Sequence, residues 1–335
     1  MTRETTREAL ARPGVQAVPI LWSTALYLLL LSEVYVGARH SSLQQSLAEY
    51  LLWAFFSFAL LLAPLWFFGF GAAEWIRKLL TSRLLRVLFP ASLALPYLVF
   101  SVPSGEFRWA FALAMLALPV VLTALLEFSN LSPKLAWQDG MVLAALATAQ
   151  VLKLFQGAWP YPGLAILPKL FLIDIALYLY LDVRKLEGVG YWLIPSRQAF
   201  VIGLREWFYF LPFGIGLGAA LHFTHFHARL PAPVTLVGAI VFTFLLVAIP
   251  EEVFFRGILQ NLLETRLGQR WALLLASLLF GLGHFNKGAA FNWRYVLMAT
   301  IAGIFYGRAW RAQRQLLASI ITHTAVDVVW SLWFR

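Results

Sequence analysis

Apolar stretches of membrane-spanning length follow one another along nearly the whole chain, and they restrict its fold more than any other feature. A helix needs about 20 such residues to cross the hydrocarbon core of a bilayer. Eleven stretches approach or reach that length: 18–37, 47–70, 84–103, 109–127, 141–156, 163–181, 199–221, 234–263, 271–286, 293–310 and 315–334. The fifth and the ninth are short. We therefore predict an all-α fold, a polytopic bundle of about 10–11 transmembrane helices.

The composition agrees with a chain whose main solvent is lipid. Of its 335 residues, 61% are hydrophobic and only 13% are charged, whereas charged residues make up about a quarter of soluble domains. The net charge is +10, but no basic stripe on a soluble face is visible, so we expect no nucleic-acid partner. The chain has no cysteine, which excludes disulfides, thiolate metal sites and a thiol nucleophile.

The basic residues indicate an orientation, because Lys and Arg accumulate in cytoplasmic loops. With the N-terminus inside, the cytoplasmic segments hold 17 Lys and Arg, the outer segments hold six, and three lie within spans. We therefore expect a cytoplasmic N-terminus, an outer C-terminus and an uncleaved first helix. Arg outnumbers Lys 20 to 6, which favours a GC-rich bacterium and hence the bacterial cytoplasmic membrane as the location of the protein.

The unusual polar residues divide the predicted helices into two blocks. Residues 1–190 hold about six helices with few ionisable side chains and no recognisable motif. A charged loop at 182–198 leads to residues 191–335, where about five helices carry the polar residues of most interest. The second block is therefore the candidate functional core, and the sequence predicts no role for the first.

Two adjacent carboxylates, Glu251 and Glu252, lie within an apolar helix. A charged group inside a bilayer costs at least ~2.5–3.5 kcal/mol, so such a residue is a candidate for function. Arg256 follows Glu252 by four residues, shares its helix face and can pair with it. Glu251 lies about 100° around the helix and is left for another partner. In the alternative interpretation, all three residues form one buried ion-pair cluster that holds helices together.

Two histidine segments follow the carboxylates. His284 ends the segment Phe280-Gly281-Leu282-Gly283-His284, and His323 stands four residues before Asp327, on the same helix face. By itself, each segment is about as consistent with packing as with function. The helical rise puts Glu251, His284 and His323 roughly 18, 21 and 13 Å from the cytoplasmic helix ends. The three side chains can then meet in a site that opens toward the cytoplasm, with groups suited to activate water and hold an oxyanion.

The three segments together resemble the CPBP family, which includes the CAAX prenyl endopeptidases and the bacterial Abi-type membrane proteins. The family signature is E-E-x-x-x-R, then F-x-x-x-H, then H-x-x-x-N or D, on successive helices. Here it reads Glu251-Glu252-Arg256, Phe280-His284 and His323-Asp327. The resemblance covers roughly residues 200–335 and does not reach the first six helices.

The resemblance implies a glutamic intramembrane protease, a membrane-embedded peptidase that acts on membrane-anchored protein or peptide substrates, in protein maturation or sorting. Glu251 would be the general base on water and His284 would assist it. His323 and the residue at 327 would form the oxyanion site. The residues that the resemblance makes structural supports of the site are Glu252, Arg256 and Phe280.

Position 327 departs from the prenyl endopeptidases, which typically carry Asn there. Asn donates a hydrogen bond, whereas Asp327 donates only when protonated. Alternatively, Asp327 orients His323 or binds a metal. Glu251, His284 and His323 are also a plausible zinc set. A metallo-type peptidase is therefore an alternative. We favour metal-free chemistry, which needs no cofactor.

Other functions stay open as well. A non-proteolytic membrane immunity or partner-binding protein could share the fold, although retention of the glutamate and both histidines favours an enzyme. A transporter also has buried charges, but no internal repeat or pair of matching broken helices is visible. Ser319 precedes His323 by four residues, a spacing that would also allow a Ser-His dyad.

Arg205 and Glu206 either line the same cavity as Glu251, His284 and His323 or form an interhelical ion pair.

Overall fold

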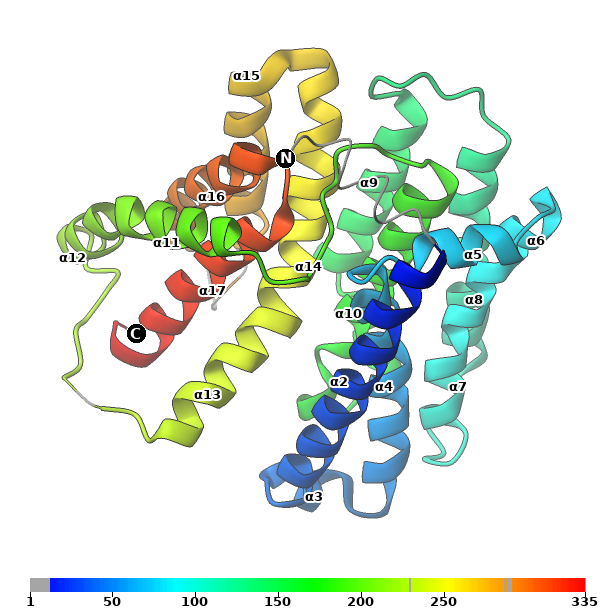
Figure 1. Cartoon of the computed structure of the whole chain (residues 1–335). Coiled ribbons are helices and arrows are strands. Elements are labelled where there is room, and N and C mark those ends of the chain that lie inside the picture. The colour runs from blue at the N-terminus through cyan, green and yellow to red at the C-terminus, as the bar shows by residue number, and fades with distance from the viewer. Residues whose placement is uncertain (1–12, 229, 286, 288–290, 335) are drawn as a thin grey trace. The chain divides into compact units, whose positions relative to one another are not determined.

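The computed structural model describes residues 13–228, 230–285, 287 and 291–334, with side chains from residue 21 onward. Within these ranges the chain forms helices and no strand (Figure 1), so the predicted all-α fold is confirmed. The helices group into two compact units. The first comprises Met1–Ala124 and Lys153–Tyr178, and the second comprises Leu125–Leu152 and Leu179–Arg335.

The first unit is built around a helix, α10 (Leu167–Leu177), that is buried at every residue except Lys169. The helices of this unit are α2 (Pro13–Arg39), α3 (Ser42–Leu47), α4 (Leu51–Phe68), α5 (Ala73–Leu79), α6 (Arg83–Leu88), α7 (Leu95–Ser101), most of α8 (Trp109–Glu127) and α10 (Leu167–Leu177). Short 3-10 turns lie at 48–50, 89–94, 156–158 and 162–164. α10 is apolar on nearly every face, as expected for a helix enclosed by others, and α4 packs against both α10 and α7.

The second unit contains all three motif segments. Its helices are α9 (Trp137–Val151), α11 (Arg197–Leu211), α12 (Gly218–Ala220), α13 (Pro233–Phe242), α14 (Ile249–Glu252), α15 (Asn261–Leu282), α16 (Trp293–Gln313) and α17 (Leu316–Trp333). Its π-helical segments are Tyr178–Val183, which begins at the unit boundary, Pro212–Leu217, Thr243–Ala248 and Val253–Gln260. α9 joins this unit through its N-terminal end, where the Leu135 amide donates to Thr265 Oγ1 at 2.8 Å and Arg184 pairs with Asp139 at 3.0 Å.

The observed helices reproduce the predicted spans with three differences. Eight helical segments of the described chain are long and apolar enough to cross a membrane: Leu21–Arg39, Ser42–Phe68, Arg83–Ser101, Trp109–Glu127, Pro162–Val183, Arg197–Ala220, Pro233–Leu282 and Leu316–Trp333. Pro233–Leu282 contains both the eighth and the ninth predicted span, divided at Gly268. The fifth, α9, has only 15 residues, and the tenth, α16, carries three arginines. Within the described residues, each of the eleven predicted stretches is thus mostly helical.

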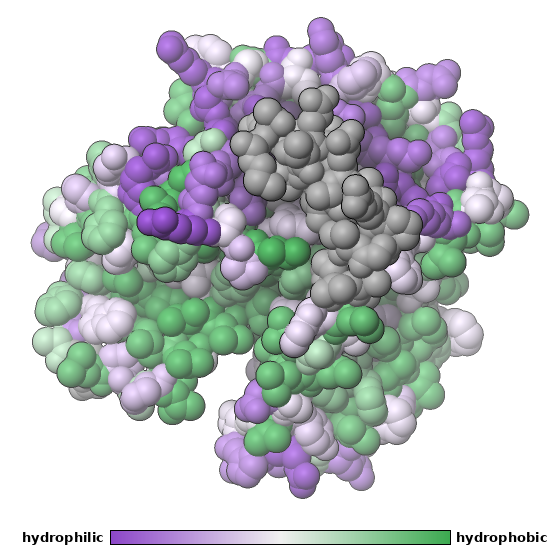
Figure 2. Space-filling view, viewed as in Figure 1, coloured by the Kyte–Doolittle hydropathy of each residue, from purple (hydrophilic) through white to green (hydrophobic). Residues whose placement is uncertain are grey.

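Hydrophobic side chains reach the surface along these helices, as expected where lipid replaces water. Figure 2 shows such side chains over large parts of the face in view. On α13, Val234, Val237 and Phe242 are exposed, and none of its ten residues is buried. An exposed apolar helix of this kind is unfavourable in water and is the normal condition in a bilayer.

The segment that carries the two motif glutamates is irregular on both sides. Pro250 has no amide hydrogen and cannot continue the regular helical ladder, and the π-helical segment Thr243–Ala248 immediately precedes α14. A second π-helical segment, Val253–Gln260, follows it. Gly268 then adopts φ 73° and ψ 169°, where the chain turns back (Figure 1). π-helical turns concentrate at functional sites because they redirect side chains within a helix.

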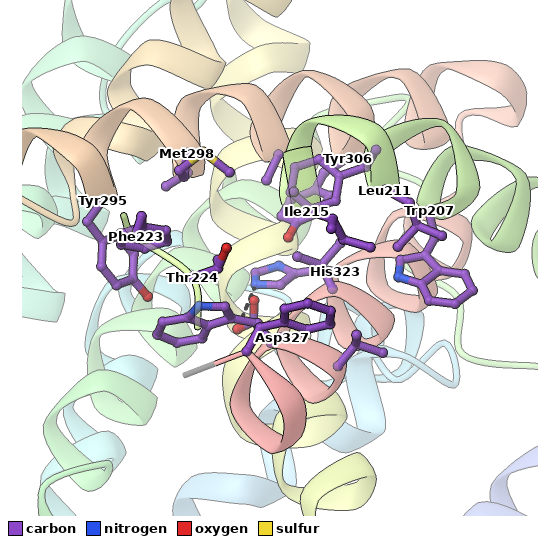
Figure 3. A pocket seen from close by; sticks show the side chains of 18 of the residues that line it. Trp207, Leu211, Ile215, Phe223, Thr224, Tyr295, Met298, Tyr306, His323 and Asp327 are labelled. Carbon is purple, nitrogen blue, oxygen red and sulfur yellow. Dashed lines mark ion pairs between the residues drawn. The ribbon is translucent and has the colours of Figure 1, made fainter. Parts of the chain in front are cut away.

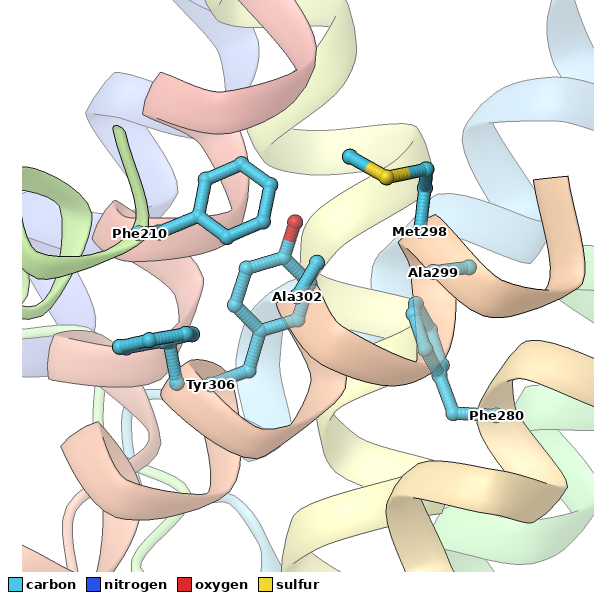
Figure 4. Packing of buried hydrophobic residues seen from close by; sticks show 7 residues of the cluster. Phe210, Phe280, Met298, Ala299, Ala302 and Tyr306 are labelled. Atoms are coloured by element: carbon cyan, nitrogen blue, oxygen red, sulfur yellow. The ribbon is translucent and has the colours of Figure 1, made fainter. Parts of the chain in front are cut away.

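Small residues allow the helices around the motifs to approach closely. In Figure 4, Phe210 of α11, Phe280 of α15 and Tyr306 of α16 converge in one buried cluster with Ala299 and Ala302. Where α11 packs against α17, Gly203 of α11 faces α17. The Thr322 hydroxyl of α17 donates to the Gly203 carbonyl at 2.9 Å. A Cβ atom on Gly203 would lie 2.8 Å from the Ala318 carbonyl oxygen and from two Ile321 carbons.

We expect Gly203→Ala to destabilise the protein by about 1–3 kcal/mol, because the added methyl group forces α11 and α17 apart. Thermal unfolding in detergent checks this. Gly238→Ala on α13 is the matched control, since its Cβ would meet nothing within 4 Å, and we expect no loss of stability there. Equal melting temperatures for the two variants would contradict the close packing of α11 on α17.

Candidate functional site

The structure brings the three motif segments together in the second unit. α14 supplies Glu251 and Glu252, α15 ends just before His284, and the middle of α17 supplies His323. Nε2 of His284 and Nε2 of His323 lie 4.0 and 3.8 Å from Oε2 of Glu251. Side chains that are up to 72 positions apart in the sequence therefore surround one carboxylate oxygen. Asp327 reaches the same group, since its Oδ2 lies 3.5 Å from His323 Nε2.

Glu252 is the most enclosed residue of the group and connects several helices. Its Oε1 lies 3.1 Å from Nη1 of Arg256 and accepts a hydrogen bond from His323 Nδ1 at 2.7 Å. Ser319 Oγ contacts its other oxygen, Oε2. The Ser319 hydroxyl also lies 2.9 Å from the Tyr306 carbonyl oxygen. Ser319 is thus bonded to Glu252, and no Ser-His dyad is formed.

Arg256 completes the charge pair and is itself almost fully enclosed. Its guanidinium lies over the rings of Phe280, at 4.4 Å, and Tyr306, at 5.1 Å. Nη2 donates to the Gly303 carbonyl at 3.2 Å. A buried cation is tolerated when a carboxylate, a carbonyl and aromatic faces together replace its hydration. Phe280, predicted as a support of the site, therefore provides one of these faces.

Each histidine ring is fixed at one nitrogen and on one face. His284 Nδ1 lies 2.8 Å from the Phe280 carbonyl oxygen. Since a carbonyl only accepts, Nδ1 is assigned the hydrogen and Nε2 is directed at Glu251. The His284 ring stacks on Tyr295, with centroids 5.3 Å apart, and the His323 ring stacks on Tyr306 at 4.5 Å. Both rings are therefore oriented before any substrate arrives.

The separations around Glu251 suit a bridging molecule better than direct bonds. Distances of 3.8 and 4.0 Å exceed the range of a hydrogen bond between heavy atoms. A water molecule between Glu251 Oε2 and His284 Nε2 could bond to both, since such gaps are commonly bridged in active sites. The carboxylate would accept one of its protons, and its oxygen would be left to attack a carbonyl carbon.

A cavity of about 90 Å³ adjoins these groups. His284, His323 and Asp327 line it, together with mostly aromatic and aliphatic side chains of α11, α16, α17 and the segment after α12 (Figure 3). Glu251 lies 4.0 and 3.8 Å from the two imidazoles. From His323 the lining runs along α17 through Trp330 to Phe334. The lining thus follows α17 toward its C-terminal end. The opening toward the cytoplasm stays a prediction.

The distances around Glu251 bear on the alternative that Glu251, His284 and His323 bind zinc. Ligand atoms around tetrahedral zinc lie about 3.3 Å apart, given bond lengths of about 2.0–2.1 Å. Nε2 of His284 and Nε2 of His323 are farther than that from Glu251 Oε2. Within the part of the chain that the structure describes, no group of three or more His, Asp or Glu side chains is arranged to hold a metal ion.

Several residues of the site carried no sequence signal that singled them out. Tyr295 and Tyr306 lie 11 residues apart on α16, a spacing that puts both on one helix face, but the same spacing is common in cores. The spacing of Ser319 from His323 suggests a nucleophile and gives no sign of its contact with Glu252. Arg205 and Glu206 do not line the cavity; Glu206 pairs with Arg205 at 2.8 Å and with Arg308 of α16 at 3.0 Å, which is the interhelical ion pair.

Comparison with known proteins supports the resemblance seen in the motifs. Residues 233–329 match the family described as type II CAAX prenyl endopeptidase, Rce1-like. This stretch contains every motif residue named above, so the resemblance to the CAAX proteases is confirmed for it. No curated protein and no solved structure is significantly similar to the chain. With eight candidate spans and a membrane-protease family match, the protein is an integral, multi-pass membrane protein.

We expect Arg256→Met to lower the stability by about 3–5 kcal/mol, because it leaves the Glu252 carboxylate buried without its cation. Thermal unfolding of the purified protein measures this. Arg205→Met is the control, since Arg205 is half-exposed and Glu206 keeps Arg308; we expect a loss under about 1 kcal/mol.

The double variant Glu252→Gln with Arg256→Met separates charge from packing. Removing both charges should recover part of the stability that Arg256→Met loses, since no uncompensated ion remains. A double variant that is less stable than Arg256→Met alone would contradict the charge-pair explanation.

Proposed function

We propose that this CAAX-protease-like membrane protein is an endopeptidase that hydrolyses a peptide bond of a membrane-associated protein with water activated by Glu251. The observation that carries the proposal is the position of Glu251 Oε2, which faces Nε2 of His284 and Nε2 of His323 at 4.0 and 3.8 Å. Carboxylate and imidazole converge there at the edge of an apolar cavity, where a substrate chain can lie beside them.

In the proposed reaction, Glu251 takes a proton from a water molecule while the water oxygen attacks the scissile carbonyl carbon. His284 holds the water through Nε2, since its Nδ1 is bound to the Phe280 carbonyl. The proton on Glu251 then passes to the departing amine as the carbon–nitrogen bond breaks. Water thus divides between the two products, and Glu251 returns to its starting form.

We assign the negative oxygen of the intermediate to His323. Its Nδ1 is bound to Glu252, and its Nε2 lies on the cavity side between Glu251 and Asp327. When both nitrogens carry protons, Nε2 can donate to an oxyanion. Asp327 is 3.5 Å from that nitrogen, which supports orientation of His323 as its role. Glu252 and Arg256 act through the position of His323.

The wider setting follows the predictions from the sequence. In this proposal residues 191–335 form the catalytic core, the substrate is a membrane-anchored protein or peptide, and the N-terminus lies in the cytoplasm of a bacterium. The alternative is a non-proteolytic immunity or partner-binding protein with the same fold. The joint presence and convergence of Glu251, His284 and His323 favours the enzyme.

Cleavage of a quenched library of C-terminal membrane-anchor peptides by the purified full-length protein tests the proposal. We expect Glu251→Gln to lower the rate about 10²–10⁴-fold, because general base catalysis contributes that much, with the thermal melt unchanged. Glu33→Gln, at an exposed position on α2, is the matched control and should keep full activity. Cleavage by Glu251→Gln at the wild-type rate would rule out its role as the base. No cleavage by the wild type would favour the non-proteolytic alternative.

The same assay decides between metal-free and zinc-dependent hydrolysis. Because the distances around Glu251 are longer than a zinc site requires, we expect 1,10-phenanthroline to leave the cleavage rate unchanged. Loss of activity with the chelator, followed by recovery on adding zinc, would instead establish the metallo-type peptidase and assign Glu251, His284 and His323 as ligands.

A further inference from the structure

The hydroxyl group of Tyr306 opens into the cavity and takes no part in the chemistry described so far. Tyr306 lines the cavity and is only 1% exposed. Its hydroxyl makes no hydrogen bond to the described residues and, unlike the indole nitrogen of Trp207, it is not sealed within the protein. The surface that it keeps therefore faces the cavity. The tyrosine that stacks on the other imidazole, Tyr295, instead accepts a hydrogen bond from Lys287 Nζ at 3.2 Å.

The ring of Tyr306 holds this hydroxyl in a fixed place beside His323. The two rings stack with centroids 4.5 Å apart and planes 14° apart. The Arg256 guanidinium lies 5.1 Å from the centroid of the same tyrosine ring, and the Phe280 ring meets it edge-on at 5.8 Å. Figure 3 shows the hydroxyl oxygen of Tyr306 directed toward His323. A phenol donates as well as accepts, so the cavity has a second oriented donor close to this imidazole.

The proposed oxyanion site needs a donor besides His323 Nε2. Asp327 lies 3.5 Å from that nitrogen, but an ionised carboxylate only accepts, and its charge opposes a negative oxygen nearby. The Asn that prenyl endopeptidases typically carry at this position would donate. Main-chain donors are also lacking on this side, because amides in the interior of α16 and α17 bond within their own helix. The missing donor must therefore be a side chain, and the Tyr306 hydroxyl is available.

The group that has to reach this hydroxyl is small. Only the carbonyl under attack and the atoms attached to it must enter the cavity, while the rest of the substrate stays outside. One water-sized group requires roughly 10–15 Å³ of such space, and the cavity measures about 90 Å³. It therefore accommodates a single peptide group beside Tyr306 and His323.

We propose, on the basis of the proposed function, that Tyr306 is a catalytic residue whose hydroxyl donates, together with His323 Nε2, to the oxygen of the scissile carbonyl. The hydrogen bond strengthens as that oxygen becomes negative, which favours the transition state over the bound substrate. The phenol keeps its proton throughout, so the water proton still passes through Glu251 to the departing amine. Tyr306 thus supplies the donor that Asp327 cannot.

Cleavage of the anchor-peptide library by the full-length protein gives the first test. Tyr306→Phe keeps the stacked ring and removes only the hydroxyl. We expect kcat to fall about 10²–10³-fold, as on the loss of one oxyanion donor, with KM and the thermal melt nearly unchanged. Tyr209→Phe is the matched control, since Tyr209 is half-exposed and lies outside the cavity lining, and it should keep full activity. Cleavage by Tyr306→Phe at the wild-type rate would overturn the inference.

The variant Asp327→Asn separates hydrogen bonding from structural support. Its amide can donate near His323 Nε2 and so replace part of what the Tyr306 hydroxyl supplies. We expect Tyr306→Phe to lower kcat by a factor that is at least about tenfold smaller in this background than in the wild type. A tyrosine that only supports His323 would lower kcat by the same factor in both backgrounds, and equal factors would contradict the proposal.

Binding of a tetrahedral anion tests the same donor without cleavage. The library is remade with a phosphinate in place of each peptide bond in turn, and retention is measured on the full-length Glu251→Gln variant in detergent. Adding Tyr306→Phe should weaken the tightest phosphinate roughly tenfold or more, and its parent peptide by only about twofold. Equal weakening of the two, or retention of no phosphinate, would refute the role of Tyr306. Phosphinate retention that depends on Tyr306, in a protein whose wild type cleaves nothing, would overturn only the proposed function.

Discussion

The carboxylate of Glu252, buried in the second unit, determines how the rest of the site is arranged. Removing a carboxylate from water is costly, and the cost is offset only when every oxygen has well-placed partners. Glu252 finds them in Arg256, Ser319 and His323. The need to neutralise one charge therefore sets the register between α14 and α17, and with it the place where Glu251 meets the two imidazoles.

Much of this arrangement could be predicted because helices have a constant rise and a constant turn. Depth estimates alone suggested that Glu251, His284 and His323 could meet, and the four-residue spacing suggested the pairing of Glu252 with Arg256. The eleven apolar stretches are mostly helical, within the described residues, for the same reason. The number of separate segments was less predictable, since α14 and its π-helical neighbours run on into α15 until Gly268 turns the chain.

What could not be predicted depends on contacts between helices that no local pattern encodes. A tyrosine in an apolar helix gives the same sequence pattern whether it packs in a core or stacks on a histidine. The sequence therefore does not identify Tyr295 and Tyr306 as parts of the site. Ser319 has the spacing of a nucleophile but meets a carboxylate from another helix. Which side chains line the cavity depends on how α11, α16 and α17 pack against one another, and depth along one helix carries no such information.

Both candidate catalytic imidazoles rest on tyrosines of a single helix, α16, and this ties access to chemistry. A slide or rotation of α16 as a unit would displace Tyr295 and Tyr306 together, and both imidazoles would lose their ring contacts at once while their Nδ1 bonds to Phe280 and Glu252 remained. A route into the cavity that opened by moving α16 would leave both imidazoles held at Nδ1 alone for as long as it stayed open. Substrate entry past α16 and a fully supported imidazole pair would therefore exclude each other in time.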